Sequence, residues 1–270
     1  MSLAFLFPGQ GSQAVGMGAD LAEAFASARE VFQEVDDALG QKLFKLMKEG
    51  PEDQLTLTEN AQPALMAVSL AVSRTLEKEF KIGVDRAAFV AGHSLGEYSA
   101  LAAAGAISLA DTARLLKLRG QAMQRAVPVG EGAMASLIGP KSDVALAEEA
   151  AKAGSALGVC VVANDNNNGN VVISGAKAAV DAAIEKAKEL GARAIPLNVS
   201  APFHCPLMQP AADEMAKALG SATILAPRAP LVANITARPT LDPEEIRRLL
   251  VEQVTGRVRW RERYPTHFFP

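Results

Sequence analysis

The chemistry that this sequence could perform centres on one serine. The pentapeptide GHSLG at residues 92–96 matches Gly-x-Ser-x-Gly, a pattern in which a nucleophilic serine, here Ser94, stands on a sharp turn between a strand and a helix. The apolar run 87–92 predicts the strand, and the alanine-rich run 94–106 predicts the helix. We therefore expect Ser94 to be a nucleophile. The alternative is a tight turn whose serine only caps the helix.

The turn would also favour negative charge beside Ser94. A helix N-terminus stabilises an anion, and the backbone N–H of Leu95 would point toward the oxyanion that forms in acyl transfer. Glu97 falls in the first turn of the same helix, so we expect it to be a helix-start carboxylate rather than the acid of a catalytic triad.

His204 is the histidine that we expect to serve as the base for Ser94. The sequence contains three histidines, and His93 adjoins the serine on a sharp turn, where its side chain projects another way. His267 lies in an unusual C-terminal tail. His204 instead lies between prolines at a predicted domain junction, a common place for a pocket. A backbone carbonyl could orient its imidazole in place of an acid; the alternative for His204 is an isolated structural histidine.

Arg119 is predicted to be a buried cation. In a helix, the positions that surround it on its face are all apolar. These positions are Leu115, Leu116, Ala122 and Met123. A buried guanidinium needs a partner, which would be either an internal acid or the carboxylate of a ligand held by two hydrogen bonds.

The elements that position these residues alternate between strand and helix. Strands are predicted at 3–7 and 87–92 and helices at 18–39, 60–80 and 94–106. The strands are continuously apolar, which is typical of a parallel sheet covered on both faces.

A second pattern begins near Pro128. It predicts strands at 132–139, 157–164, 170–175 and 192–198 and helices at 141–153 and 176–190, in the order βαββαβ of ferredoxin-like domains. Asn168-Gly169 predicts a type I′ hairpin turn. We predict an α/β fold in which residues 1–127 and 199–270 form the larger domain and residues 128–198 a ferredoxin-like insert.

Composition excludes several classes of function. The net charge of −3 argues against binding to nucleic acid or to an anionic membrane surface. No apolar run reaches the roughly 18 residues of a membrane span, and no signal peptide is recognisable, so we expect a cytoplasmic protein. Cys160 and Cys205 lack metal-binding spacing, so we expect no metal and two buried thiols.

Residues 9–14, GQGSQA, also match a loose dinucleotide-binding pattern. That reading needs an acidic residue about 20 positions later, at the end of a second strand. The region 25–39 is predicted to be helical, and no Gly-Lys-Ser/Thr follows, so we disfavour a nucleotide site.

Six segments together carry a family resemblance. In chain order they are FLFPGQGSQ, GHSLGEYSAL, RGQAMQ, GAMASLIG, NVSAPFHCPLM and VANITA. From residue 3 to about 260, the sequence closely resembles the malonyl-CoA:acyl carrier protein transacylase family. The resemblance implies an α/β-hydrolase-like core with a ferredoxin-like insert. From about Arg263 it stops, which predicts a truncated or altered C-terminal end of the larger domain.

The resemblance also implies roles for individual residues. Ser94 would be acylated, His204 would be the general base, and Arg119 would hold the malonyl carboxylate. The backbone N–H groups of Gln10 and Leu95 would form the oxyanion hole.

Three further positions match the family more weakly. The main chain of Gln253 would orient the catalytic histidine, and Asn164 would line the pocket. Phe203 resembles the version of its motif that is associated with malonyl rather than methylmalonyl groups.

The implied reaction moves malonate from malonyl-CoA to the phosphopantetheine thiol of acyl carrier protein, for fatty acid synthesis. Coenzyme A is a product, no cofactor stays bound, and we expect a monomer. Three alternatives remain: an acyltransferase for polyketide synthesis, a serine hydrolase or thioesterase, and an inactive module that binds the carrier protein.

Overall fold

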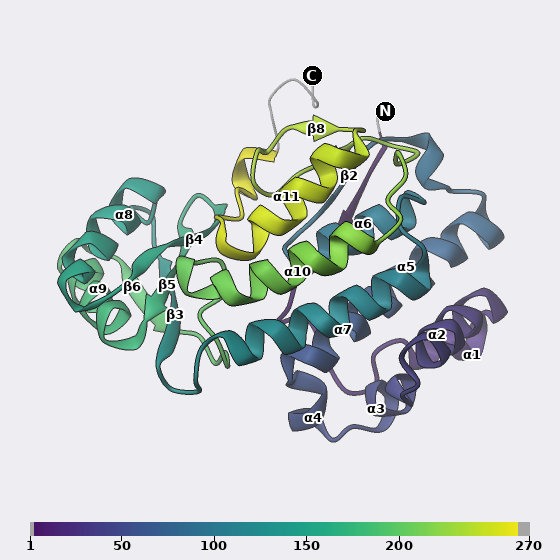
Figure 1. Cartoon of the computed structure of the whole chain (residues 1–270), viewed down its shortest axis with the longest axis horizontal. Helices are drawn as coiled ribbons and strands as arrows, with labels where there is room; N and C mark the ends of the chain where they lie inside the picture. The colour runs from purple at the N-terminus through teal and green to yellow at the C-terminus, as the bar shows by residue number, and fades with distance from the viewer. Residues whose placement is uncertain (1–2, 264–270) are drawn as a thin grey trace. The chain divides into compact units, whose positions relative to one another are not determined.

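The computed structural model describes residues 3–263, which divide into two compact units (Figure 1). One unit contains residues 3–121, 217–233 and 238–248, and the other contains 122–216, 234–237 and 249–263. A compact unit need not be a domain that folds by itself, so the predicted boundaries at 128 and 199 stay a prediction. The altered end predicted from about Arg263, with His267, lies almost entirely outside the described residues.

The first unit is built on a four-stranded sheet in the order β1-β2-β7-β8. Its strands are β1 (Leu3–Phe7), β2 (Ala87–Gly92), β7 (Leu231–Val232) and β8 (Pro239–Thr240). β2 pairs in parallel with β1 and with β7, whereas β8 runs antiparallel at the edge. The predicted parallel sheet is confirmed for β1, β2 and β7 but not for β8, and β2 has the predicted bounds.

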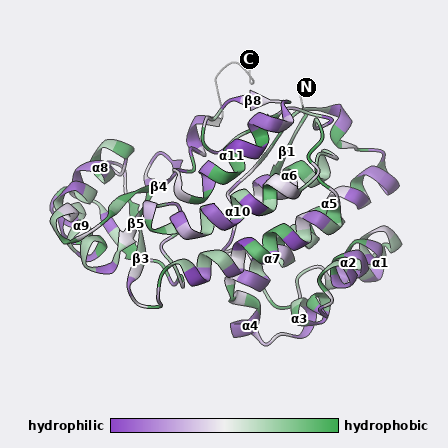
Figure 2. Ribbon diagram, viewed as in Figure 1, coloured by the Kyte–Doolittle hydropathy of each residue, from purple (hydrophilic) through white to green (hydrophobic). Residues whose placement is uncertain are grey.

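Helices are layered on this sheet. α6 (Leu95–Ala103) packs on β1 and β2, α5 (Thr58–Phe80) packs on α6, and α2 (Ala26–Leu39) packs on α5. The remaining α-helices with residues in this unit are α1 (Ala19–Ala24), α3 (Leu43–Glu49), α4 (Glu52–Thr56), α7 (Leu109–Ala126), α10 (Gln209–Ser221) and α11 (Pro243–Thr255). Figure 2 shows hydrophobic and hydrophilic residues mixed along most of these helices, as expected when one face is buried.

Two details of the helices differ from the prediction. The helix expected over 18–39 is divided at Phe25, whose backbone is extended and whose ring packs edge-on against Phe80 at 6.1 Å. The helix predicted over 60–80 is α5, which begins at Thr58, two residues earlier, and Pro63 lies inside it beyond the first turn. Tertiary packing of an aromatic ring overrides a helical pattern that continues through the break.

The second unit contains the predicted ferredoxin-like arrangement. Its elements are β3 (Gly132–Ile138), α8 (Val144–Ala153), β4 (Cys160–Asn167), β5 (Asn170–Ala176), α9 (Lys177–Glu189) and β6 (Arg193–Pro196). The sheet order is β4-β5-β3-β6 with antiparallel neighbours, and α8 and α9 pack on it over a core of small aliphatic side chains.

The hairpin between β4 and β5 has the predicted length but not the predicted turn. Asn167 pairs with Asn170 across a two-residue loop, in which Gly169 has a φ of 93°. A type I′ turn needs positive φ at both central residues. Asn168 is not among the described residues with positive φ, so the type I′ prediction was wrong.

Candidate active site

Ser94 occupies the bend between β2 and α6 in the first unit. Its φ of 53° and ψ of −111° are rare for a residue with a side chain and store backbone strain. A Cβ on Gly92 would lie 1.8 Å from the carbonyl oxygen of Gly96, and one on Gly96 would lie 2.5 Å from that of Phe7. Both glycines are therefore required by close backbone approach, and the predicted strand–turn–helix context is confirmed.

Arg119 of α7 reaches the hydroxyl of this serine. Nη2 of Arg119 donates to Oγ of Ser94 at 3.1 Å, and Nη1 donates to Oε1 of Gln62 at 2.8 Å. The guanidinium is 1% exposed and lies 5.7 Å from the centre of the Tyr98 ring. Burial lowers the pKa of the Arg119 guanidinium below its usual value, and nearby Tyr98 and Glu97 oppose that shift. An arginine keeps its charge in proteins, so a buried cation adjoins the nucleophile.

This environment bears on the two partners that the sequence left open for Arg119. The acid Glu97 is buried and acts on the Arg119 pKa. Nη1 and Nη2 also donate to an amide and a hydroxyl, both uncharged. Hydrogen bonds between two ionised groups are stronger than bonds to an uncharged acceptor, so the carboxylate of a ligand can replace either acceptor.

The loop after β1 lies against the serine bend. A Cβ on Gly9 would meet Nδ1 of His93 at 2.8 Å and its carbonyl oxygen at 2.9 Å. His93 therefore contacts this loop. The hydroxyl of Ser12 donates to the Gly9 carbonyl at 2.9 Å, and Nε2 of Gln10 donates to Oγ1 of Thr58 at 3.2 Å. A dinucleotide site would need a second strand in the region 25–39, but that region forms the helix α2.

His204 belongs to the second unit. It is 3% exposed, has a φ of 58°, and its Nδ1 lies 2.8 Å from the main-chain carbonyl oxygen of Gln253. In the neutral imidazole, a carbonyl partner at Nδ1 requires the proton there, which makes Nε2 the acceptor nitrogen of the ring. A backbone carbonyl thus orients the imidazole of His204, as the sequence led us to expect.

The other predicted residues of the second unit are also buried. Phe203 precedes His204 in the chain and is 9% exposed, and Asn164 in β4 forms a parallel bridge with Val258. Beside Asn164, both oxygens of the buried Asp165 carboxylate share the Nε–H of Arg261, at 2.9 and 3.1 Å. This pair fixes the segment after α11 to β4.

Sequence reasoning missed three residues of the first unit: Thr58, Gln62 and Tyr98. Tyr98 is four residues after Ser94 in the predicted helix, so its position in the sequence could have identified it. Thr58 and Gln62 are far from Ser94 in the sequence, and no motif joins them to it.

The two cysteines are free thiols. Cys205 is buried as expected, whereas Cys160 is only half-buried. Burial raises the pKa of the Cys160 thiol to about 12 and raises that of Cys205 as well, so both are protonated at neutral pH. Within residues 3–263, no group of three or more histidine, cysteine or acidic side chains could hold a metal ion. No helix of this part of the chain is long and apolar enough to cross a membrane.

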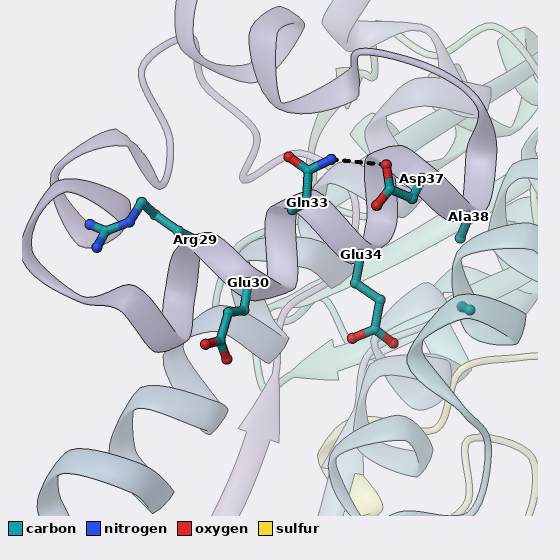
Figure 3. Close-up of a pocket in the computed structure, with 7 residues that line it drawn as sticks. Arg29, Glu30, Gln33, Glu34, Asp37 and Ala38 are labelled. Carbon is teal, nitrogen blue, oxygen red and sulfur yellow. Dashed lines mark hydrogen bonds between the residues drawn. The ribbon is translucent and has the colours of Figure 1, made fainter.

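A hollow of about 720 Å³ lies along α2, and none of the candidate site residues lines it (Figure 3). Five of its seven lining residues are polar or charged, and the full set is Arg29, Glu30, Gln33, Glu34, Asp37, Ala38 and Ala110. Glu30 pairs with Lys78 and Glu34 with Arg74. The lining holds no nucleophile, so this hollow is not the candidate active site.

Comparison with known proteins places this arrangement in a family. The model of the acyl transferase domain family matches residues 4–263. The chain belongs to this family. A similar protein is the malonyl CoA-acyl carrier protein transacylase of Bacillus subtilis (strain 168), which is 46% identical over 261 residues, covering 96% of this chain and 81% of that protein.

Solved structures agree with this assignment. The acyl-carrier-protein-S-malonyltransferase of Bartonella henselae is 58% identical with a TM-score of 0.94, over 97% of this chain and 83% of that chain. A malonyl-transacylase in complex with a type II PKS acyl-carrier protein is 44% identical with a TM-score of 0.91, over 96% of this chain and 83% of that one. The fold of this acyl transferase, including its ferredoxin-like part, is therefore that of known malonyltransferases.

Proposed function

We propose that this acyl transferase moves the malonyl group of malonyl-CoA to the phosphopantetheine thiol of acyl carrier protein, in fatty acid synthesis. The observation that carries the proposal is the 3.1 Å hydrogen bond between Arg119 and Ser94. One methylene separates the two carbonyl carbons of malonate. An arginine that holds the free carboxylate must therefore lie within a few ångströms of the atom that attacks the thioester, as Arg119 does.

The reaction has two halves that use the same groups. In the first half, Nε2 of His204 takes the proton from Oγ of Ser94 as that oxygen attacks the thioester carbonyl. The backbone N–H groups of Gln10 and Leu95 hold the oxyanion. When the carbon–sulfur bond breaks, His204 returns the proton to the departing thiolate, so coenzyme A leaves as a thiol and Ser94 carries malonate.

In the second half, His204 takes the proton of the phosphopantetheine thiol, whose sulfur attacks the malonyl ester. The ester bond breaks and Ser94 recovers the proton. No bound cofactor or metal enters either half. The scheme requires Nε2 of His204 to come within about 2.6–3.2 Å of Oγ of Ser94. Gln253 fixes the tautomer through its carbonyl, and Phe203 and Asn164 line the acyl pocket.

The carrier protein is the proposed partner, and a monomer in the cytoplasm is the proposed state. The partner is supported by the similar transacylase whose structure contains an acyl carrier protein. Because that carrier belongs to type II polyketide synthesis, a polyketide carrier is the second candidate for this chain. The chemistry at Ser94 is the same for both.

Intact-protein mass spectrometry tests the proposal. Wild-type protein mixed with malonyl-CoA is expected to hold a malonyl adduct that persists until a carrier protein with its phosphopantetheine arm is added, and peptide mapping should place the adduct on Ser94. Ser94→Ala should form none, and His204→Ala should form it far more slowly. Rapid loss of the adduct to water would instead indicate a hydrolase, and no adduct at all would indicate an inactive binding module. Offering fatty acid and polyketide carriers in parallel separates the two candidate pathways.

A further inference from the structure

One face of the first turns of α5 contacts both Gln10, in the loop after β1, and Arg119. Thr58 and Gln62 are four residues apart, so their side chains lie on the same side of the helix. Each is 1% exposed. Oγ1 of Thr58 accepts a hydrogen bond from Nε2 of Gln10, and Oε1 of Gln62 accepts one from Nη1 of Arg119. The proposed function uses the backbone of Gln10 and the side chain of Arg119.

The first turn of α5, which contains Thr58, packs closely against α7. A Cβ on Gly120 would lie 2.6 Å from Cα of Glu59 and 2.7 Å from the carbonyl oxygen of Thr58, so the two helices touch backbone to backbone. Oε2 of Glu59 accepts a hydrogen bond from Nε2 of Gln121 at 2.9 Å and pairs with Nζ of Lys117 at 3.3 Å. A side chain that is hydrogen-bonded to the first turn of α5 is therefore held in a fixed position.

The loop that needs such support has an exposed tip. Gly11 and Ser12 are exposed, and Gly11 has a φ of 107°. The base of the loop is fixed where Gly9 packs on His93. Beyond that contact, the Gln10 side chain ties the loop to a buried hydroxyl. An oxyanion donor is effective only when it is held within a fraction of an ångström of its working position.

We propose that Thr58 is a positioning residue for the oxyanion hole. Its hydroxyl holds the Gln10 side chain and thereby aims the backbone N–H of Gln10, without touching the substrate. This inference rests on the proposed function. It assigns the two residues of the α5 face to different tasks: Thr58 supports transfer of any acyl group, whereas Gln62 supports only the recognition of a carboxylate.

The test compares Thr58→Val, which keeps the shape but loses the acceptor, with Thr58→Ser, which keeps the hydroxyl. We expect Thr58→Val to lower kcat by about tenfold for both malonyl-CoA and acetyl-CoA, with KM changed less than about twofold. Full loss of an oxyanion donor costs about 10²–10³-fold, and a displaced donor should cost less. Thr58→Ser should restore most of kcat.

Thr75→Val is the matched control. Thr75 is buried in the same helix, and its hydroxyl lies 3.4 Å from that of Ser27, but it is 17 residues, or about 25 Å, further along the axis. It should lose similar thermal stability and keep wild-type kcat. A double-mutant cycle with Gln10→Ala, which keeps the backbone N–H, isolates the route: the double variant should lose no more activity than either single variant.

Three results would overturn the inference. They are an unchanged kcat in folded Thr58→Val, a loss confined to malonyl-CoA, and additive losses in the cycle with Gln10→Ala. Failure of the proposed function looks different, because wild-type protein would then form no malonyl adduct at all.

Discussion

The amide of Gln62 allows the role of Arg119 to be tested without touching either arginine or serine. Gln62→Glu keeps the size of the side chain and the acceptor for Nη1 of Arg119, which now lies 2.8 Å from Oε1. The substitution adds one negative charge. Next to the Arg119 cation the new carboxylate stays ionised, because an adjacent opposite charge favours the charged form. The new carboxylate would then offset the positive charge of the guanidinium before the substrate binds.

The size of the effect follows from the geometry. Two carboxylates bound to one guanidinium lie roughly 5 Å apart, and at an effective dielectric constant of about 20 they repel each other by about 3 kcal/mol. Since about 1.4 kcal/mol is a factor of ten in rate, kcat/KM for malonyl-CoA should fall roughly 10²-fold. Acetyl-CoA has no distal carboxylate, so its transfer should change less than about threefold.

The assay measures transfer of radiolabelled malonyl and acetyl groups to the carrier protein, side by side. Gln54→Glu, an exposed substitution of the same charge in α4, is the control and should leave the ratio of malonyl to acetyl transfer at its wild-type value. Thermal unfolding checks that Gln62→Glu is folded. If folded Gln62→Glu keeps the wild-type ratio, Arg119 does not bind the malonyl carboxylate and the reasoning fails.

Two further predictions concern the bend and a thiol. Gly92→Ala should destabilise the protein by at least about 1–3 kcal/mol and abolish adduct formation, because the new Cβ would lie 1.8 Å from the Gly96 carbonyl oxygen; denaturant unfolding and mass spectrometry measure both, and near-normal values for either would contradict the strained bend. Cys160, with its pKa raised to about 12 by burial, should react with iodoacetamide at pH 8 at least about 10²-fold more slowly in folded than in unfolded protein, and its rate should rise with pH up to that value because only the thiolate attacks. Rapid labelling of folded protein at pH 8 would show that the thiol is not protected.

The sequence was most informative where local chemistry dictates the structure. The glycines at 92 and 96 have no alternative at a bend this tight, so the pentapeptide predicted the turn that the structure contains. The order of strands and helices between residues 132 and 196 predicted the ferredoxin-like sheet, because alternating short patterns leave few ways to pair the strands. The apolar neighbours of Arg119 predicted its burial.

The sequence was least informative about contacts between distant segments. Gln62 and Arg119 are 57 positions apart, and Gln10 and Thr58 are 48 apart. The residue types of Thr58 and Gln62 do not indicate such partners, because polar side chains near the start of a helix usually cap the helix or are solvated. The break at Phe25 was mispredicted for a related reason: packing of its ring on Phe80, rather than local preference, decides it.

Backbone strain links the two residues on which the proposed reaction depends. Among residues 3–263, four that are not glycine have positive φ: Lys81, Ser94, His204 and Ala237. Such conformations cost about 1–3 kcal/mol each and persist only where the surroundings impose them, which happens most often at functional sites. Lys81 has an ordinary reason, because it ends the helix α5. Ser94 and His204 have none of this kind: one stands between glycines that clear space for its backbone, and the other is held by the main chain of Gln253. The strain is therefore consistent, independently of any motif, with the catalytic roles proposed for these two positions.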